Sequence, residues 1–215
     1  MIPIVMSHLT ILKKNEVYLQ IDSDPHVFYE LSDQFTFELP GAKFMPQYRK
    51  RYWDGKIRLF NVNNGQIYVG LLDKIQKFCK DHEYSYSFVD NEYYGTPFEV
   101  NEHISYEGVK DYITSISKYS PRDYQIEGVY DALRHNRKLL ISPTASGKSL
   151  MIYSIVRYYV ERGENTLIVV PTTSLVEQMY KDFADYGWDV GSFCHKIYAG
   201  KERETDSQVI ITTWQ

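Results

Sequence analysis

The stretch from Ser142 to Ser149 constrains the fold more than any other part of the chain. Its sequence, Ser-Pro-Thr-Ala-Ser-Gly-Lys-Ser, fits the phosphate-binding pattern G-x-x-x-x-G-K-[ST], with Ser142 in place of the first glycine. The apolar run 138–141 just before it predicts a buried strand. Apolar residues at helical spacing after it predict a helix that ends near Gly163. Strand, loop and helix in this order favour a nucleotide-binding loop over a chance Gly-Lys-Ser on a surface turn.

Each part of this loop has a chemical role to fill. Gly147 lets the backbone come close to a phosphate group, and successive backbone N–H groups with the helix N-terminus form a cradle for an anion. Lys148, the candidate catalytic residue, would reach the β- and γ-phosphates, and the Ser149 hydroxyl would hold Mg²⁺. The expected contacts with the nucleotide phosphates are Thr144, Ala145, Ser146, Gly147, Lys148 and Ser149.

The charge of the chain is unevenly distributed. The 215 residues carry a net charge of −4, so the chain as a whole is not a basic nucleic-acid binder. The segment from Lys43 to Arg58, which we call the basic–aromatic strip, nevertheless holds six basic residues and one acidic residue. A local basic segment on an acidic chain indicates a polyanionic partner better than the total charge does.

Four aromatic residues alternate with the cations of the basic–aromatic strip: Phe44, Tyr48, Tyr52 and Trp53. Such a mixture can neutralise phosphates and also stack on bases. The alternative is an edge loop with a solvated charge run, in which Trp53 fills the core of a small domain. Composition alone leaves both open. The candidate nucleic-acid contacts are Arg49, Lys50, Arg51, Trp53, Lys56 and Arg58.

Several classes of site are disfavoured by the sequence. Cys79 and Cys194 form no C-x-x-C pair, which suits a reducing compartment. The six histidines are scattered, so we expect no metal ligation by protein side chains of the zinc type. The N-terminus has no basic region before its apolar residues, and no apolar run approaches the ~18 residues of a membrane span. We therefore expect a cytoplasmic protein without membrane contact.

The predicted elements divide the chain into three parts. Residues 1–90 predict a small α+β domain, and the acidic residues 91–118 predict a connection that becomes helical after Ser105. Residues 119–215 alternate strands and helices, which predicts an α/β unit with a parallel sheet. The expected strands of the first part are 2–6, 16–21, 35–39 and 84–88, with a hairpin of 57–60 and 66–69. The expected helices begin at Pro25, span 71–79, and begin at Ser174 with a capping box to Glu177.

Four motifs of residues 119–215 resemble those of superfamily 2 helicases and occur in the same order. They are Arg122-x-Tyr-Gln125, similar to the Q-motif element; Pro143-Thr-Ala-Ser-Gly-Lys-Ser149, similar to motif I; Leu167-Ile-Val-Val-Pro-Thr-Thr-Ser-Leu-Val-Glu-Gln178, similar to motif Ia; and Ile211-Thr-Thr-Trp-Gln215, similar to motif Ib. The resemblance implies a first RecA-like lobe that binds ATP and Mg²⁺, with Gln125 and Arg122 on the adenine side.

The same resemblance implies that residues at the ends of two predicted strands contact DNA. It implies that hydroxyl and main-chain N–H groups there contact the DNA backbone, a mode that positions a protein without reading sequence. Helix capping is an alternative role for the threonines, and the two roles are compatible. The residues concerned are Pro171, Thr172, Thr173 and Thr213.

The first part of the chain resembles a more specific group. The pattern Pro46-x-Tyr-Arg-x-x-x-Trp-Asp-Gly-Lys-Ile-Arg-Leu59, followed by Gly70-Leu-Leu, is similar to the domain before the motor in recombination helicases of the phage UvsW type. The resemblance implies an ATP-driven enzyme that unwinds or branch-migrates DNA junctions and R-loops in a phage-infected cell. Its expected partner is branched, duplex or single-stranded DNA, or an RNA–DNA hybrid, and we expect a monomer.

Two departures from the helicase pattern bear on activity. Ser142 replaces a smaller residue in the loop, and we expect little effect from this change. The sequence contains no D-E-x-[HD] box and no second lobe with its arginines, and an arginine finger alone is worth ~10³–10⁵ in rate. We expect these 215 residues to bind nucleotide and DNA without completing turnover. The rivals are a P-loop kinase or other NTPase, which Gln125 and Pro171-Thr-Thr disfavour, and a short product that binds DNA without turnover.

Overall fold

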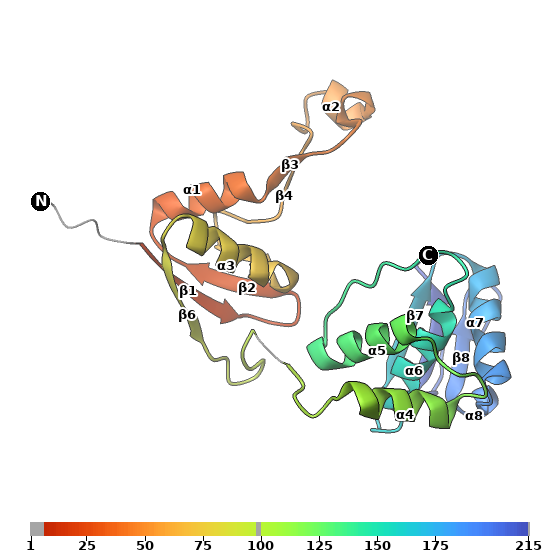
Figure 1. Ribbon diagram of the computed structural model, residues 1–215. Helices are drawn as coiled ribbons and strands as arrows, with labels where there is room; N and C mark the ends of the chain where they lie inside the picture. The colour runs from red at the N-terminus through yellow and green to blue at the C-terminus, as the bar shows by residue number, and fades with distance from the viewer. Residues whose placement is uncertain (1–6, 98–99, 215) are drawn as a thin grey trace, which may run out of the picture. The chain divides into compact units, whose positions relative to one another are not determined.

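The computed structural model describes residues 7–97 and 100–214, which form two compact units (Figure 1). The strand predicted at residues 2–6 and the last residue of the motif at 211–215 lie outside the described residues. Among the helices in the described ranges, none has the length and apolar character needed to cross a membrane.

The first unit is built on a four-stranded sheet with the order β5-β2-β1-β6. The strands are β1 (His8–Lys13), β2 (Tyr18–Asp22), β5 (Gln66–Tyr68) and β6 (Ser85–Val89). Strand β1 is antiparallel to β2 and parallel to β6. One face of the sheet is covered by α1 (Pro25–Gln34) and α3 (Leu72–Asp81), as Figure 1 shows. The buried strand residues that face this core are Leu9, Ile11, Leu19, Ile21 and Ile67.

Most elements of the first unit follow the sequence pattern. Helix α1 begins at Pro25, directly after Asp24, as predicted, because proline fits the first turn of a helix without losing a hydrogen bond. Helix α3 buries Ile75 and Phe78, and the expected strand near the end of the unit forms as β6. The short 3-10 helix η2 (Val69–Leu71) joins β5 to α3.

The predicted hairpin of 57–60 with 66–69 forms only at its turn, where Asn61 makes an antiparallel bridge with Gln66; the strand pairing predicted beyond it is wrong. Strand β4 (Lys56–Arg58) pairs with β3 (Thr36–Glu38), whereas β5 pairs with β2 in the other sheet. The turn itself forms, and Gly65 adopts a left-handed φ of 65° while its carbonyl accepts a hydrogen bond from Ile21 N. A turn signal specifies a local reversal of the chain, but not which strands pair beyond it.

The β3–β4 ribbon extends away from the four-stranded sheet and carries the basic–aromatic strip at its far end (Figure 1). Two short helices lie between its strands, η1 (Ala42–Phe44) and α2 (Pro46–Arg49). Gly55 has a left-handed φ of 80°, and a Cβ there would come within 3.0 Å of the Tyr48 ring. Glycine is therefore required for the close packing at this end of the ribbon.

The second unit contains a three-stranded parallel sheet with the order β7-β9-β8. Its strands are β7 (Thr166–Val170), β8 (Cys194–Ile197) and β9 (Val209–Thr213). Its helices are α4 (Tyr106–Ile116), α5 (Asp123–His135), α6 (Lys148–Val160), α7 (Thr173–Asp185) and α8 (Val190–Phe193). The α+β first unit and this parallel-sheet unit confirm the predicted fold class.

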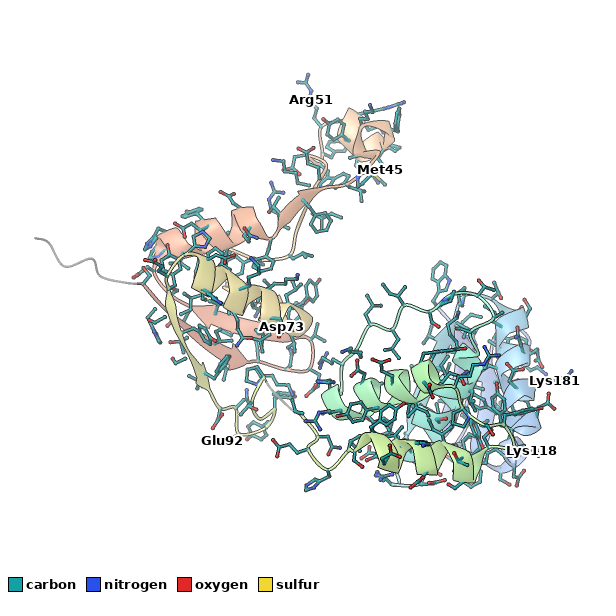
Figure 2. The ribbon with its side chains drawn as sticks, in the orientation of Figure 1. Met45, Arg51, Asp73, Glu92, Lys118 and Lys181 are labelled. Atoms are coloured by element: carbon teal, nitrogen blue, oxygen red, sulfur yellow. The ribbon has the colours of Figure 1, made fainter. Side chains whose placement is uncertain are left out.

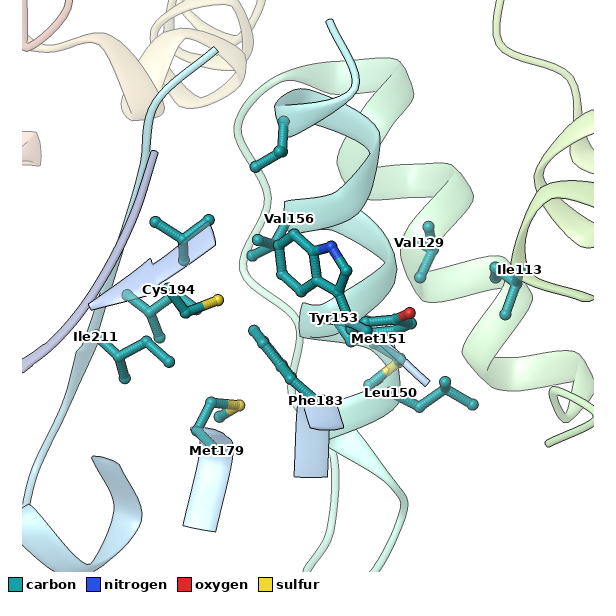
Figure 3. Close-up of a cluster of buried hydrophobic side chains, with 14 of the residues drawn as sticks. Ile113, Val129, Leu150, Met151, Tyr153, Val156, Met179, Phe183, Cys194 and Ile211 are labelled. Atoms are coloured by element: carbon teal, nitrogen blue, oxygen red, sulfur yellow. The ribbon is translucent and has the colours of Figure 1, made fainter. Parts of the chain in front are cut away.

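Aromatic and aliphatic side chains from helices and strands form the core of the second unit (Figure 3). Tyr153 is fully buried there, and its ring centroid lies 5.3 Å from that of Phe183. Helix α4 belongs to this core through Val109 and Ile113, although it lies within the predicted connection 91–118. We keep the boundaries at 90 and 118 as a proposal.

The strand predicted at 138–141 is wrong. The segment has no regular secondary structure, and Leu139 and Ile141 are 82% and 90% exposed. A strand needs a hydrogen-bonded neighbour, and within the described residues β7, β8 and β9 pair only with one another. The apolar run shows that the segment suits burial, but it does not supply the partner strand.

Candidate nucleotide site and nucleic-acid interface

The phosphate loop ends where α6 begins, as the sequence predicts. Gly147 is the N-cap of α6 with a left-handed φ of 75°, and Lys148 is the first residue of the helix. A Cβ on residue 147 would collide with the Gln125 side-chain amide, so only glycine fits this position. The first backbone N–H groups of α6 therefore lie at the end of the loop, as an anion cradle requires.

Gln125 joins the start of α5 to the loop. It is buried, and its Nε2 donates to the carbonyl oxygens of Ser146 at 3.0 Å and Gly147 at 3.3 Å. Its Oε1 accepts a hydrogen bond from Arg122 N at 2.9 Å. An amide has two N–H donors and two acceptor lone pairs, so this bonding leaves one lone pair on Oε1.

A chain of hydrogen bonds connects Arg122 to the same loop. The Arg122 guanidinium donates to the Tyr124 hydroxyl at 3.1 Å, and this hydroxyl donates to Ser146 O at 3.0 Å. Tyr124 is absent from the predicted site residues, although it lies inside the Arg-x-Tyr-Gln pattern. An open cavity of about 610 Å³ lies beside these groups and is lined also by Asp131 and Met151.

Lys148 is folded back onto the loop. Its Nζ donates to Ser142 O at 3.0 Å and to Pro143 O at 2.5 Å. Phosphate oxygens would have to replace these two carbonyl oxygens as acceptors. The Ser142 hydroxyl is 2.5 Å from that of Ser146, so the serine in place of the first glycine ties the two ends of the loop together.

The candidate metal ligand Ser149 has a partner that the sequence does not reveal. Tyr186 lies near the Ser149 hydroxyl: burial of the Tyr186 phenol raises the pKa of the phenol, and the Ser149 hydroxyl lowers it by a smaller amount. Tyr186 follows α7 directly and packs on Tyr153 of α6 with ring centroids 5.1 Å apart. No sequence motif connects residues so distant in the chain, which is why the prediction missed Tyr186.

The candidate contacts with the DNA backbone come together at the carboxyl ends of β7 and β9. Thr213 lies beside Val170 in the parallel register of β9 and β7, so it neighbours the exposed segment 171–173 that follows β7. Thr172 is the N-cap of α7, and its Oγ1 accepts from Leu175 N at 3.4 Å. The threonine therefore has the capping role, and its exposure leaves room for a second role.

The predicted capping box from Ser174 to Glu177 is wrong. Because the N-cap of α7 is Thr172, two residues before Ser174, Glu177 lies beyond the capping position. Its carboxylate instead accepts from Lys196 Nζ at 2.8 Å and from the Tyr198 hydroxyl. These two hydrogen bonds lower the pKa of Glu177.

The basic–aromatic strip is exposed but locally ordered. The Arg58 guanidinium pairs with the Asp54 carboxylate at 2.5 Å and holds the Asp54 pKa at about 2. The Trp53 indole donates to Lys56 O at 2.9 Å, and Arg49 Nε donates to Lys43 O at 3.4 Å. Arg51 points away from the ribbon in Figure 2.

Trp53 is outside the buried cluster of the first unit. The alternative in which it fills the core of that unit is therefore wrong. Among the described residues, Asp54 is the only carboxylate paired with a cation of the strip, so Arg49, Lys50, Arg51 and Lys56 have no acidic partner within 4.0 Å. This arrangement leaves the strip strongly positive.

Comparisons with known proteins match both units. A family model described as "DNA helicase UvsW, N-terminal" matches residues 9–90, and one described as "Type III restriction enzyme, res subunit" matches residues 118–215. The chain is 34% identical over 209 residues to the ATP-dependent DNA helicase uvsW of Enterobacteria phage T4. This match covers 92% of the chain and 40% of the relative, so the chain spans well under half the length of that protein.

Solved structures give the same result. A crystal structure of the UvsW helicase from bacteriophage T4 has a TM-score of 0.82 and 32% identity, covering 96% of this chain and 75% of that one. A second crystal structure of T4 UvsW has a TM-score of 0.83 and 31% identity, covering 96% of this chain and 43% of that one.

Proposed function

The chain belongs to the family of UvsW-type DNA helicases, and from this premise we propose that it forms the nucleotide-binding and first DNA-binding parts of an ATP-dependent helicase. The proposed substrates are branched DNA and R-loops in recombination and repair, within the cytoplasm of a phage-infected cell. The carboxylate box and the second lobe that hydrolysis needs are absent from these 215 residues. We therefore propose that this chain binds nucleotide and DNA, and that turnover requires a carboxylate box and a second lobe in addition.

The bond network of the phosphate loop supports the ATP site. Residues 144–149 would hold the phosphates through backbone N–H groups at the start of α6, and Lys148 Nζ would exchange its two carbonyl acceptors for phosphate oxygens. The lone pair left on Gln125 Oε1 can accept from an amino group such as that of adenine. Arg122 lines the adjacent cavity on the proposed adenine side.

We expect Mg²⁺ to bind together with ATP. The Ser149 hydroxyl fits a hard cation, which prefers oxygen ligands. Mg²⁺ would supply neutralisation of phosphate charge, and the residues of this chain would hold the phosphates.

DNA would contact two surfaces of this chain. The basic–aromatic strip offers unpaired cations on the first unit, and residues 171–173 with Thr213 offer hydroxyl and N–H groups on the second. Contacts of both kinds go to the phosphate backbone and do not read sequence, which suits a protein that moves along DNA.

Binding of a fluorescent ATP analogue with Mg²⁺ tests the nucleotide site. We expect Lys148→Ala to weaken binding about tenfold or more, because it removes a charge-assisted contact. Lys181→Ala is the matched control, since Lys181 is an exposed lysine on α7 of the same unit. Equal affinity of Lys148→Ala and Lys181→Ala for the analogue would refute the loop assignment.

A further inference from the structure

An open cavity of about 620 Å³ lies at the far end of the β3–β4 ribbon. Its volume falls within the range of small-molecule sites in proteins. Three aromatic rings and three cations contribute to its walls, together with the carboxylate of Asp54. The aromatic and basic residues are Tyr48, Tyr52, Trp53, Lys43, Arg49 and Arg51.

Two of the three rings are held in place by the protein. The Trp53 indole donates its N–H to Lys56 O at 2.9 Å, and the Tyr48 ring packs so closely on Gly55 that a Cβ there would be 3.0 Å away. Tyr52 differs, because its side chain is 83% exposed and has no hydrogen-bond partner among the described residues. The cavity thus has a fixed aromatic wall and one ring that is free to close on a ligand.

The charge of the cavity favours an anion. Lys43, Arg49 and Arg51 have no carboxylate within 4.0 Å in the described part of the chain. The one acidic group, Asp54, is neutralised by its ion pair with Arg58. A ligand with both a flat aromatic surface and a negative charge would satisfy both kinds of wall.

We propose that this cavity takes one unpaired nucleotide of a DNA strand, with its base on the aromatic rings and its phosphate on the cations. The inference rests on the proposed DNA-binding function of the strip and adds a preference for unpaired bases. A base within a duplex is already stacked and paired, so it must be flipped out before a protein ring can cover it. The cavity therefore selects single-stranded segments, such as those at forks and junctions, over uninterrupted duplex.

A comparison of two tyrosine variants tests the pocket. Tyr52→Leu removes an exposed ring without removing a side-chain hydrogen bond, and Tyr29→Leu does the same on α1, where Tyr29 is 65% exposed. The probes are a labelled oligothymidylate and a blunt duplex of equal length. We expect Tyr52→Leu to bind the oligothymidylate about tenfold more weakly and the duplex as before, since stacking on a protein ring contributes strongly for each base. Tyr29→Leu should bind both probes as the parent does.

A charge-reversed variant separates failure of the pocket from failure of the DNA interface. Replacing Arg49, Lys50 and Arg51 by Glu should weaken binding of both probes and flatten the salt dependence. If this variant loses affinity while Tyr52→Leu binds oligothymidylate as the parent does, the pocket is refuted and the interface stands. An equal loss for both probes in Tyr52→Leu also refutes the preference for unpaired bases. If neither variant changes binding, the interface and the pocket fail together.

Discussion

The buried amide of Gln125 links α5 to the phosphate loop, and its removal should have a measurable cost in stability. Gln125→Ala deletes the two bonds from Nε2 to Ser146 O and Gly147 O and the bond from Arg122 N to Oε1. Two of these bonds have good geometry and are worth about 1 kcal/mol each, while the third, at 3.3 Å, is worth about half as much. The two loop carbonyls keep one other donor each, from Tyr124 and Leu150, so no buried acceptor is left entirely unpaired.

The expected loss of unfolding free energy for Gln125→Ala is therefore about 2–3 kcal/mol. Gln125→Glu should cost at least as much near neutral pH, because a carboxylate cannot donate and would face two carbonyl oxygens. Both variants should also bind the ATP analogue more weakly, since the loop loses its support from α5.

Urea unfolding followed by the fluorescence of Trp188, in a parent whose other tryptophans Trp53 and Trp214 are replaced by Phe, measures this loss. Trp188 is 8% exposed in the core of the second unit, so its emission reports that unit. Gln178→Ala on the exposed side of α7 is the matched control and should stay within about 0.5 kcal/mol of the parent. A Gln125→Ala variant as stable as Gln178→Ala would show that the bonds between α5 and the loop carry no net stability.

Three further changes have defined outcomes. Gly55→Ala should weaken DNA binding and leave the Trp188 transition unchanged, because the added Cβ meets the Tyr48 ring and the φ of 80° disfavours alanine; normal DNA binding would contradict this. Tyr153→Phe should destabilise the second unit by about 1–3 kcal/mol, since the buried hydroxyl bonds a carbonyl and a guanidinium; urea unfolding checks it. Burial raises the pKa of Cys79 to about 11 and of Cys194 to about 12. The buried, un-ionised thiols therefore contribute fully to stability below about pH 9, and this contribution is lost as the pH rises through the two pKa values. Iodoacetamide at pH 8 should label both thiols only on unfolding. Rapid labelling of the folded protein would contradict this.

Local patterns predicted local structure well. The apolar spacing of residues 71–79 and the proline at 25 placed α3 and α1, and the glycine at 147 with the apolar residues after it placed α6. These elements depend on interactions within a few residues, which the sequence displays directly.

Pairing between distant segments was harder to predict. Residues 57–60 have the alternation of a strand, but their partner is β3 rather than β5. Residues 138–141 have the composition of a buried strand, but no described strand pairs with them. In both cases the sequence shows a preference for pairing, and the choice of partner depends on the rest of the fold.

The residues of the candidate site also divide into those that a local motif predicts and those that depend on contacts between distant segments. Gly147, Lys148 and Ser149 follow from one motif, and Gln125 with Arg122 follows from a resemblance. Their contact with the loop could not be read from spacing alone, since Gln125 and Ser146 lie 21 residues apart. Tyr124 could have been found inside its motif, whereas Tyr186 reaches Ser149 only through the packing of α7 on α6.

The most direct test of the proposed motor is the DNA-stimulated ATPase rate of a protein in which this chain is joined to a carboxylate box and a second lobe. In that protein Lys148→Ala should abolish ATP hydrolysis, because it removes the amine that we propose contacts the β- and γ-phosphates, while DNA binding through the basic–aromatic strip persists. An ATPase rate equal to that of the parent would contradict the assignment of residues 142–149 as the phosphate loop of a DNA helicase.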